Sequence, residues 1–230
     1  MKRFWTAARA VEAEDGWGVE LDGRPLKTPS RVALVVPMRD MAEAIAAEWS
    51  GAGEAVDPRA MPLTGLANAA VDRVAPDPVT FSGGLAKYAE ADLFCYRAAG
   101  PAKLVQRQAA QWDPLLAWAR RRFEADFVVT DAIVHIGQPA ATVARLGQAV
   151  AALDAYRLAA LSPLVTIGGS LVAALAVVEE AVPLDTIWEA VSLDERWQIE
   201  QWGDDDEAVA SLANRRTDFE AAARFLSLLG

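Results

Sequence analysis

The residues that could carry chemistry are few, and the densest group lies in QWGDDDEA at residues 201–208. Its four consecutive acids, 204–207, could ligate a metal ion or serve as catalytic carboxylates. Calcium loops alternate their ligands with spacer residues so that oxygens converge, whereas these acids are adjacent and Gly203 precedes them. Catalytic carboxylate pairs need one acid in an apolar pocket and another in a different environment. The pattern therefore favours either a solvated helix start or a surface that binds another protein.

Both of these interpretations have physical support. Acids at a helix N-terminus are stabilised by the helix dipole, typically by about 0.3–1 kcal/mol each. Glu200 and Trp202 flank the acids, and an aromatic anchor beside a charged rim is a common composition of protein interfaces. Trp202 could equally be a core tryptophan wedged under the loop. The residue types alone leave these alternatives open.

The single cysteine and the single histidine are the remaining reactive side chains. Cys95 lies among apolar and aromatic residues in DLFCYR, which is typical of an inert buried thiol. His135 lies in VVTDAIVHIG and is interpreted as a structural histidine, because metal sites normally need clusters of His and Cys. A hydrolase that uses Cys95 with His135, or the acidic stretch 204–207, is the alternative function. Nothing in the sequence places Cys95 and His135 together.

Motifs for bound cofactors are absent from the sequence. There is no G-x-x-x-x-G-K-[ST] phosphate loop, no G-x-G-x-x-G after a strand, and no G-x-S-x-G nucleophile elbow. We therefore expect no cofactor, no metal and no small-molecule substrate. The longest apolar run, residues 163–178, has 16 residues and two glycines, and a membrane span needs about 20.

Charge is distributed unevenly along the 230-residue chain, whose formal net charge is −10. Residues 179–207 hold eleven acids and one base, so this stretch accounts for the whole net charge. Nucleic acids and anionic membranes require clustered Lys and Arg, so neither is an expected partner. The asymmetry points instead to a partner with positive or hydrogen-bond-donating groups.

The elements that must position these residues fall into two parts. Asp22-Gly23 between residues 17–21 and 24–27 predicts a β-hairpin, and residues 32–36 predict a further strand. Helical spacing predicts helices over 38–50 and 65–73, the second capped by the Thr64 hydroxyl. The prolines within 74–80 then predict a boundary, with an N-terminal α+β domain over 1–78 and a larger helical domain over 79–230.

The second part reads as helical almost throughout. Ser162-Pro163 is expected to end a helix, and Ser192 with Glu195 has the pattern of a capping box. Residues 127–136 are β-like. The predicted helices cover residues 102–123, 140–161, 164–180, 185–191 and 207–228. The fold class predicted is therefore α+β.

Seven motifs, in order, resemble those of the ATP12 chaperones, which assist assembly of the F1 sector of ATP synthase. The motifs are LDGRPLKTP (21–29), EW (48–49), MPLTGLANAAVD (61–72), DLFCYRA (92–98), RQAAQWDPLLAW (107–118), SLVAALAV (170–177) and ERWQIEQWGDDDEA (195–208). The resemblance implies a small α+β domain, a helical domain and no enzymatic activity. It also implies binding of the free F1 α subunit, whose subunit interface is shielded until the β subunit replaces the chaperone.

The resemblance further implies that an acid within the stretch 195–207 is functional. Glu200 and Glu207 are the candidates, with Asp205 behind them. Arg24 and Lys27 at the tip of the N-terminal hairpin are either a second contact or simply a hydrophilic turn.

The first residues have no long apolar region and carry early acids, so we expect no mitochondrial presequence, and the sequence has only one cysteine. Members of the family in eukaryotes act in the mitochondrial matrix, so we expect a bacterial cytoplasmic protein in a reducing compartment.

Overall fold

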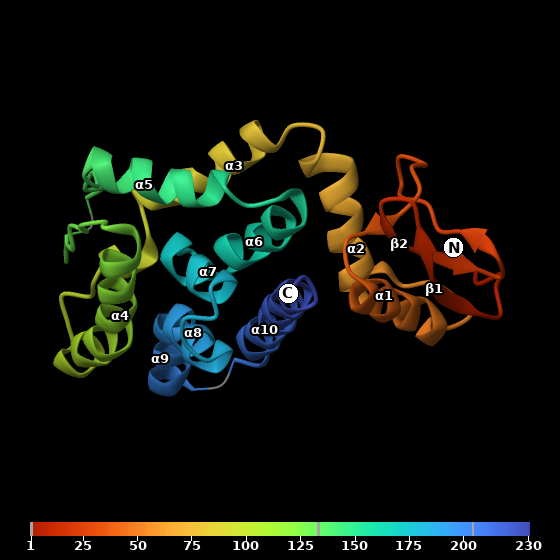
Figure 1. The fold of residues 1–230 in the computed structure, drawn as a ribbon. Coiled ribbons are helices and arrows are strands. Elements are labelled where there is room, and N and C mark those ends of the chain that lie inside the picture. The colour runs from red at the N-terminus through yellow and green to blue at the C-terminus, as the bar shows by residue number, and fades with distance from the viewer. Residues whose placement is uncertain (1, 133, 204) are drawn as a thin grey trace. The chain divides into compact units, whose positions relative to one another are not determined.

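The computed structural model describes residues 2–132, 134–203 and 205–230, and these form two compact units. Unit 1 comprises the chain up to Pro78 together with residues 154–160 and 221–230. Unit 2 comprises residues 79–153 and 161–220. The later segments 154–160 and 221–230 of unit 1 lie beyond residue 78, where the sequence predicts the boundary between the domains. Figure 1 shows unit 1 largely in red and orange, with its sheet beside α1 and α2.

Unit 1 begins with an antiparallel sheet in which β1 pairs with β2, and β2 pairs with both β3 and β4. Asp22 and Gly23 have φ values of 50° and 79°, the left-handed conformation that the predicted hairpin turn requires. The hairpin is confirmed, but the strands predicted over 24–27 and 32–36 are shorter than predicted, with two residues each. The strands are β1 (Ala8–Ala13), β2 (Gly16–Leu21), β3 (Arg24–Pro25) and β4 (Val35–Val36).

The helices of unit 1 pack on this sheet and on one another. They are α1 (Arg39–Gly51), the 3-10 turn Pro58–Ala60, α2 (Pro62–Ala69) and the π-helical turn Ala70–Val74. The prediction that Thr64 caps α2 is wrong. Glu48 of α1 accepts hydrogen bonds from the backbone nitrogens of Leu63 (2.7 Å) and Thr64 (2.8 Å), and from the Thr64 hydroxyl (2.6 Å).

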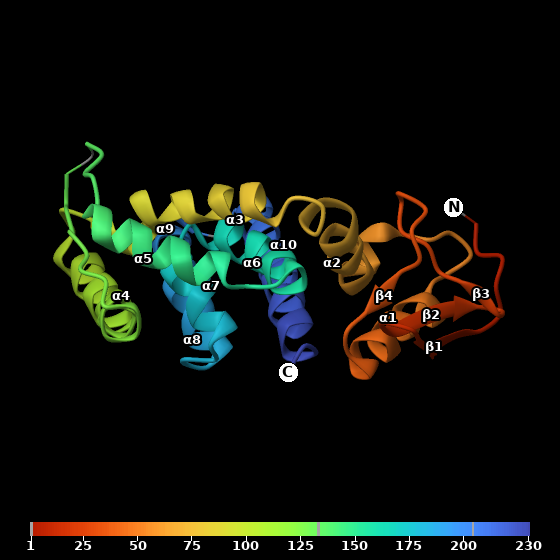
Figure 2. The same cartoon turned by 45° about the horizontal axis from the view of Figure 1, so that its top comes forward.

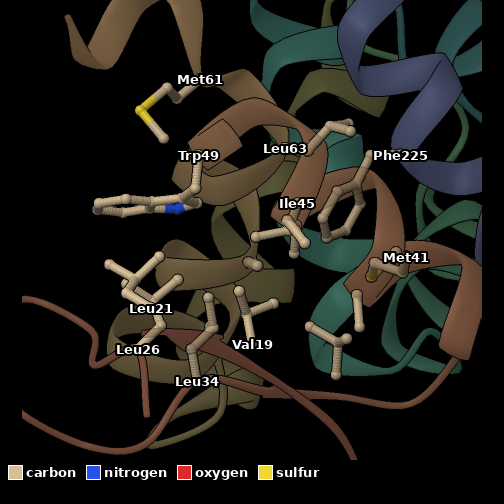
Figure 3. Packing of buried hydrophobic residues seen from close by; sticks show 14 of the residues in the cluster. Val19, Leu21, Leu26, Leu34, Met41, Ile45, Trp49, Met61, Leu63 and Phe225 are labelled. Atoms are coloured by element: carbon tan, nitrogen blue, oxygen red, sulfur yellow. The ribbon is translucent and has the colours of Figure 1, made fainter. Parts of the chain in front are cut away.

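The core of unit 1 lies between the sheet and α1. Figure 3 shows Ile45 near its centre, with Val19 on one side and Phe225 on the other. Phe225 comes from the C-terminal end of α10, which explains why residues 221–230 belong to this unit. Tyr156 ties the other late segment to the sheet, because its hydroxyl donates to the carbonyl oxygen of Val35 at 2.5 Å.

Unit 2 is helical, and Figures 1 and 2 show its helices stacked around α7. Every residue of α7 from Leu171 to Val177 is buried. Its longer elements are α3 (Pro78–Ala86), α4 (Ala102–Phe123), α5 (Ala140–Ala151), α6 (Ala155–Gly168), α7 (Leu171–Val178), α8 (Leu184–Val191), α9 (Leu193–Trp202) and α10 (Asp206–Ser227), with short 3-10 turns at Lys87–Glu90 and Leu93–Cys95. α6 and α10 contribute to both units.

Two helix boundaries of unit 2 differ from those predicted. The predicted helix 140–161 is divided near Asp154, whose Oδ1 accepts from the backbone nitrogens of Tyr156 and Arg157 and so caps α6. Pro163 does not end that helix but lies inside it. The predicted helix 164–180 is broken at Gly169, which has φ of 64°, a conformation that glycine adopts without penalty.

A buried carboxylate, Asp92, holds this break in place. Ser170 is the N-cap of α7, and its Oγ accepts from the backbone nitrogen of Ala173 at 3.0 Å. That hydroxyl donates to Asp92, which also accepts from the backbone nitrogens of Val172 (2.9 Å) and Phe94 (3.0 Å). Burial raises the pKa of Asp92 to about 6, although these donors favour the ionised form.

Two further local predictions for unit 2 are wrong. Residues 127–136 form no extended strand; apart from an isolated bridge at Thr130, the described part is irregular. The side-chain amide of Gln138 occupies both backbone groups of Val128 that a neighbouring strand would use. The capping box also fails, since the Ser192 hydroxyl donates to the carbonyl oxygen of Trp188 and Glu195 pairs with Arg215.

Candidate functional site

A groove lies between α9 and the N-terminal half of α10, the blue helices in Figure 1. Each helix presents residues spaced three and four apart, which places them on one helical face. The groove has a volume of about 700 Å³, within the range of protein ligand sites. Its lining comprises Glu195, Gln198, Ile199 and Trp202 from α9, Gly203 and Asp205 from the turn, and Ala208, Ser211, Leu212 and Arg215 from α10.

Apolar side chains form much of this groove. Ile199 and Leu212 are half-buried, and the Trp202 side chain stands at its edge with 81% of its surface exposed. This exposure rules out the interpretation of Trp202 as a core residue. An exposed tryptophan beside a concave apolar surface has the composition of a protein-interface anchor.

The N-terminal half of α10 is little buried. No residue of α10 before Phe219 is buried, and Val209 is 41% exposed. Most helical stability in proteins comes from packing an amphipathic face against other elements. About half of this helix therefore presents a surface that another molecule can cover.

The acids predicted from the sequence lie around this groove in different ways. Asp205 lines it, and its Oδ1 accepts from the backbone nitrogen of Glu207 at 3.0 Å, which caps the start of α10. Glu200 lies outside the lining and pairs with Arg107 of α4 at 2.6 Å. The guanidinium of Arg107 also lies 5.0 Å from the Trp197 ring. Arg107 of α4 therefore contacts two residues of α9, Glu200 and Trp197, and joins the two helices. Asp204 lies outside the described residues.

Asp194 is a fourth acid here, and it was not among the acids predicted to bind a partner. It lines a second pocket of about 480 Å³ together with Trp197 and Trp202. Burial raises the pKa of Asp194, while a 2.8 Å hydrogen bond from the Gln108 side-chain amide lowers it and nearby Glu195 raises it. The predicted capping box over residues 192–195 assigned roles to Ser192 and Glu195 and none to Asp194. Its position three residues before a tryptophan, on the same helical face, was the available signal.

The remaining predicted binding residues, Arg24 and Lys27, belong to unit 1. Arg24 is exposed in β3, and Lys27 is exposed and forms an isolated bridge with Ala33. They are not part of the groove, whose lining residues all belong to unit 2.

Cys95 and His135 have surroundings that do not favour nucleophilic catalysis. The Cys95 side chain is fully buried, and burial together with Asp92 raises its thiol pKa to about 12, whereas a reactive cysteine needs thiolate character and access. His135 is exposed, contrary to the sequence-based expectation of a structural histidine in a strand. Its Nδ1 lies 3.0 Å from the Tyr96 hydroxyl.

Within residues 2–132, 134–203 and 205–230, no three His, Cys, Asp or Glu side chains are grouped as a metal site. The helices formed by these residues include none that is both long and apolar enough to cross a membrane. An open groove with an exposed aromatic edge and an acidic surround is typical of a protein-binding surface.

Comparison with known proteins places the chain in a class. The family model for the ATP12 chaperone protein matches residues 2–120. The structure of Atp12 from Paracoccus denitrificans superposes with a TM-score of 0.94 at 39% identity, covering 100% of this chain and 98% of that one. A single-substitution variant of the same protein matches equally well. The Atu1473 protein from Agrobacterium tumefaciens, described as a candidate chaperone, matches with a TM-score of 0.94 at 35% identity, covering 100% of this chain and 86% of that one.

The α+β fold and these matches define a chaperone. The chain belongs to the ATP12 chaperone family.

Proposed function

We propose that this protein is an assembly chaperone of the F1 sector of ATP synthase, which binds the free α subunit in the bacterial cytoplasm. It shields the subunit interface of α until the β subunit replaces it. The family assignment supports the chaperone role. The observation that carries the binding role is the 81% exposure of Trp202 at the edge of an open groove.

The side chains around the groove would contribute to binding in two ways. Trp202, Ile199 and Leu212 provide apolar surface, and removing such surface from water is the main source of affinity. Asp205 and Glu207, with the partly exposed Glu200, supply negative charge that speeds association and selects the partner. Arg24 and Lys27 on unit 1 offer a second, separate contact.

Release does not require nucleotide hydrolysis by the chaperone. The groove is open and modest in volume, and interface area by itself does not guarantee tight binding. A β subunit that buries more of the same α surface would displace the chaperone by competition. No covalent step is needed at any stage.

The test measures binding of the purified α subunit to the wild-type chain and to variants. Trp202→Ala should weaken binding about 30-fold, because hot-spot aromatics contribute about 2 kcal/mol and 1.4 kcal/mol corresponds to tenfold. Glu207→Lys should slow association and reduce its dependence on salt. The matched control is Glu14→Lys, an exposed charge reversal in the β1–β2 turn, which should bind normally. Absence of α binding by the wild-type chain would refute the proposal.

A further inference from the structure

We infer that the α9–α10 groove receives an amphipathic helix of the client protein, with a bulky apolar stripe flanked by Lys or Arg. This inference rests on the proposed function and specifies which kind of client element the site accepts. Two helical faces already line the groove, and a third helix laid between them would complete the packing. Helix-in-groove recognition is one of the recurring modes of peptide binding.

The dimensions of the groove suit such an occupant. One turn of a helix about 10 Å across and 5.4 Å long occupies roughly 400 Å³. A groove of about 700 Å³ therefore holds between one and two turns. The lining residues at 195, 198, 199 and 202 and at 208, 211, 212 and 215 follow the same three-and-four spacing that a helical partner presents.

The apolar side chains of the groove favour a bound helix that has apolar residues along the face it presents to the groove. Ile199 and Leu212 are only half-buried, and Trp202 is exposed beside them. A leucine-sized side chain that enters between them removes water from both partners, which stabilises the complex by about 25 cal/mol for each Å² of apolar surface. An extended or wholly polar segment would leave the apolar surface of the groove exposed to water.

The acids around the groove favour basic residues on either side of the apolar face of the bound helix. Arg215 is already paired with Glu195, so the one base in the lining is neutralised. Asp205, Asp206 and Glu207 at the turn remain exposed. Their charges favour a partner whose flanking residues are Lys or Arg, and like charges brought there would repel.

The probe is a fluorescein-labelled synthetic peptide of about four helical turns, with leucine at i, i+3, i+4 and i+7 and lysine elsewhere. A second peptide carries the same leucines with glutamate in place of lysine. Fluorescence anisotropy measures binding to the full-length chain, and circular dichroism reports whether the bound peptide is helical. The lysine peptide should bind as a helix, at least tenfold more tightly than the glutamate peptide.

Variants locate the binding surface. Leu212→Asp and Trp202→Ala should each weaken binding of the lysine peptide at least tenfold, and Trp202→Ala avoids any folding risk because the side chain is exposed. The matched control is Val134→Asp, an exposed valine outside the groove, which should bind normally. Equal binding by both peptides, a bound peptide that is not helical, or equal losses in Val134→Asp would overturn the inference.

The α-subunit measurement separates this inference from the proposed function. If α binds and the groove variants do not change its affinity, the helix-in-groove inference fails while the chaperone role stands. If α does not bind but the lysine peptide follows the expected pattern, the groove is a helix site and the proposed client is wrong.

Discussion

Replacing Asp92 by asparagine should change how the stability of unit 2 depends on pH. Burial raises the pKa of this carboxyl from 3.8 to about 6. One pKa unit corresponds to 1.36 kcal/mol, so ionisation of Asp92 costs the folded state about 3 kcal/mol at neutral pH. The carboxyl is protonated in both states below about pH 4 and ionised in both above about pH 6.

The sign of the effect follows from which state loses its proton first. Between about pH 4 and pH 6 the unfolded chain is already ionised at Asp92 while the folded chain still binds the proton. The free energy of unfolding therefore falls as the pH rises through this window. Asp92→Asn removes the titration, so the stability of the wild type minus that of the variant should fall by about 2.4 kcal/mol between pH 4 and pH 7.

At pH 4 the variant should be the less stable protein. The asparagine carbonyl can accept only some of the donors from Phe94, Ser170 and Val172, and its NH₂ group then faces another donor. Leaving a buried polar group unsatisfied costs about 1–3 kcal/mol. The variant should approach or exceed the wild type in stability by pH 7, where the wild-type carboxylate is ionised.

Urea unfolding followed by circular dichroism from pH 4 to pH 7 measures the difference. Hydrogen exchange of the α7 amides, corrected for intrinsic rates, assigns it to unit 2. The control is Asp154→Asn: burial raises the pKa of Asp154, but hydrogen bonds from Arg157 lower it to a net value below 3.8. The stability that Asp154 contributes is lost only below about pH 4, so its difference should stay constant over the measured range. A constant or rising difference for Asp92→Asn would refute the reasoning.

Two further predictions concern single contacts. Glu48→Ala should destabilise unit 1 by about 2 kcal/mol, because α2 loses its cap. Thermal unfolding measures this loss. The control is Glu43→Ala, which removes an exposed i,i+4 partner of Arg39 and should cost less than about 0.5 kcal/mol. Cys95 should resist iodoacetamide at pH 8 in the native chain and react in urea, because burial raises its pKa to about 12; rapid labelling of the native chain, measured by mass spectrometry, would contradict the burial.

Local sequence signals predicted those elements whose determinants lie within the element. The amphipathic pattern at residues 102–123 gives α4 with the same bounds, and Asp22-Gly23 gives the hairpin turn. In both cases the deciding residues lie within a few positions of one another. The α+β class followed because hairpin signals occur only near the N-terminus.

The errors arise where a distant side chain decides a local structure. The start of α2 depends on Glu48, fourteen positions before Pro62 in the printed sequence. The start of α7 depends on Asp92, which is 80 residues from Val172. Pro163 was expected to end a helix, but buried neighbours on both sides, Leu161 and Leu164 among them, keep the chain helical through it.

The candidate site was only partly predictable for the same reason. Residue types indicated Trp202 and the acids around it, since an aromatic beside carboxylates is visible in one stretch of sequence. The groove itself requires two helical faces to lie opposite one another, and its α10 face, with Leu212 and Arg215, carried no local signal. Exposure of Trp202 is likewise a property of the packing.

The proposed binding role of the groove is compatible with a stable fold, because the groove lies outside the regions of greatest burial. Stability is concentrated in α7, where every residue from Leu171 to Val177 is buried, and in the sheet and α1 of unit 1. The first half of α10 contributes no buried residue, so the client binding proposed for it would disturb neither core. Its acids make copies of the chain repel one another. In the proposed function the same charges would also attract a basic client.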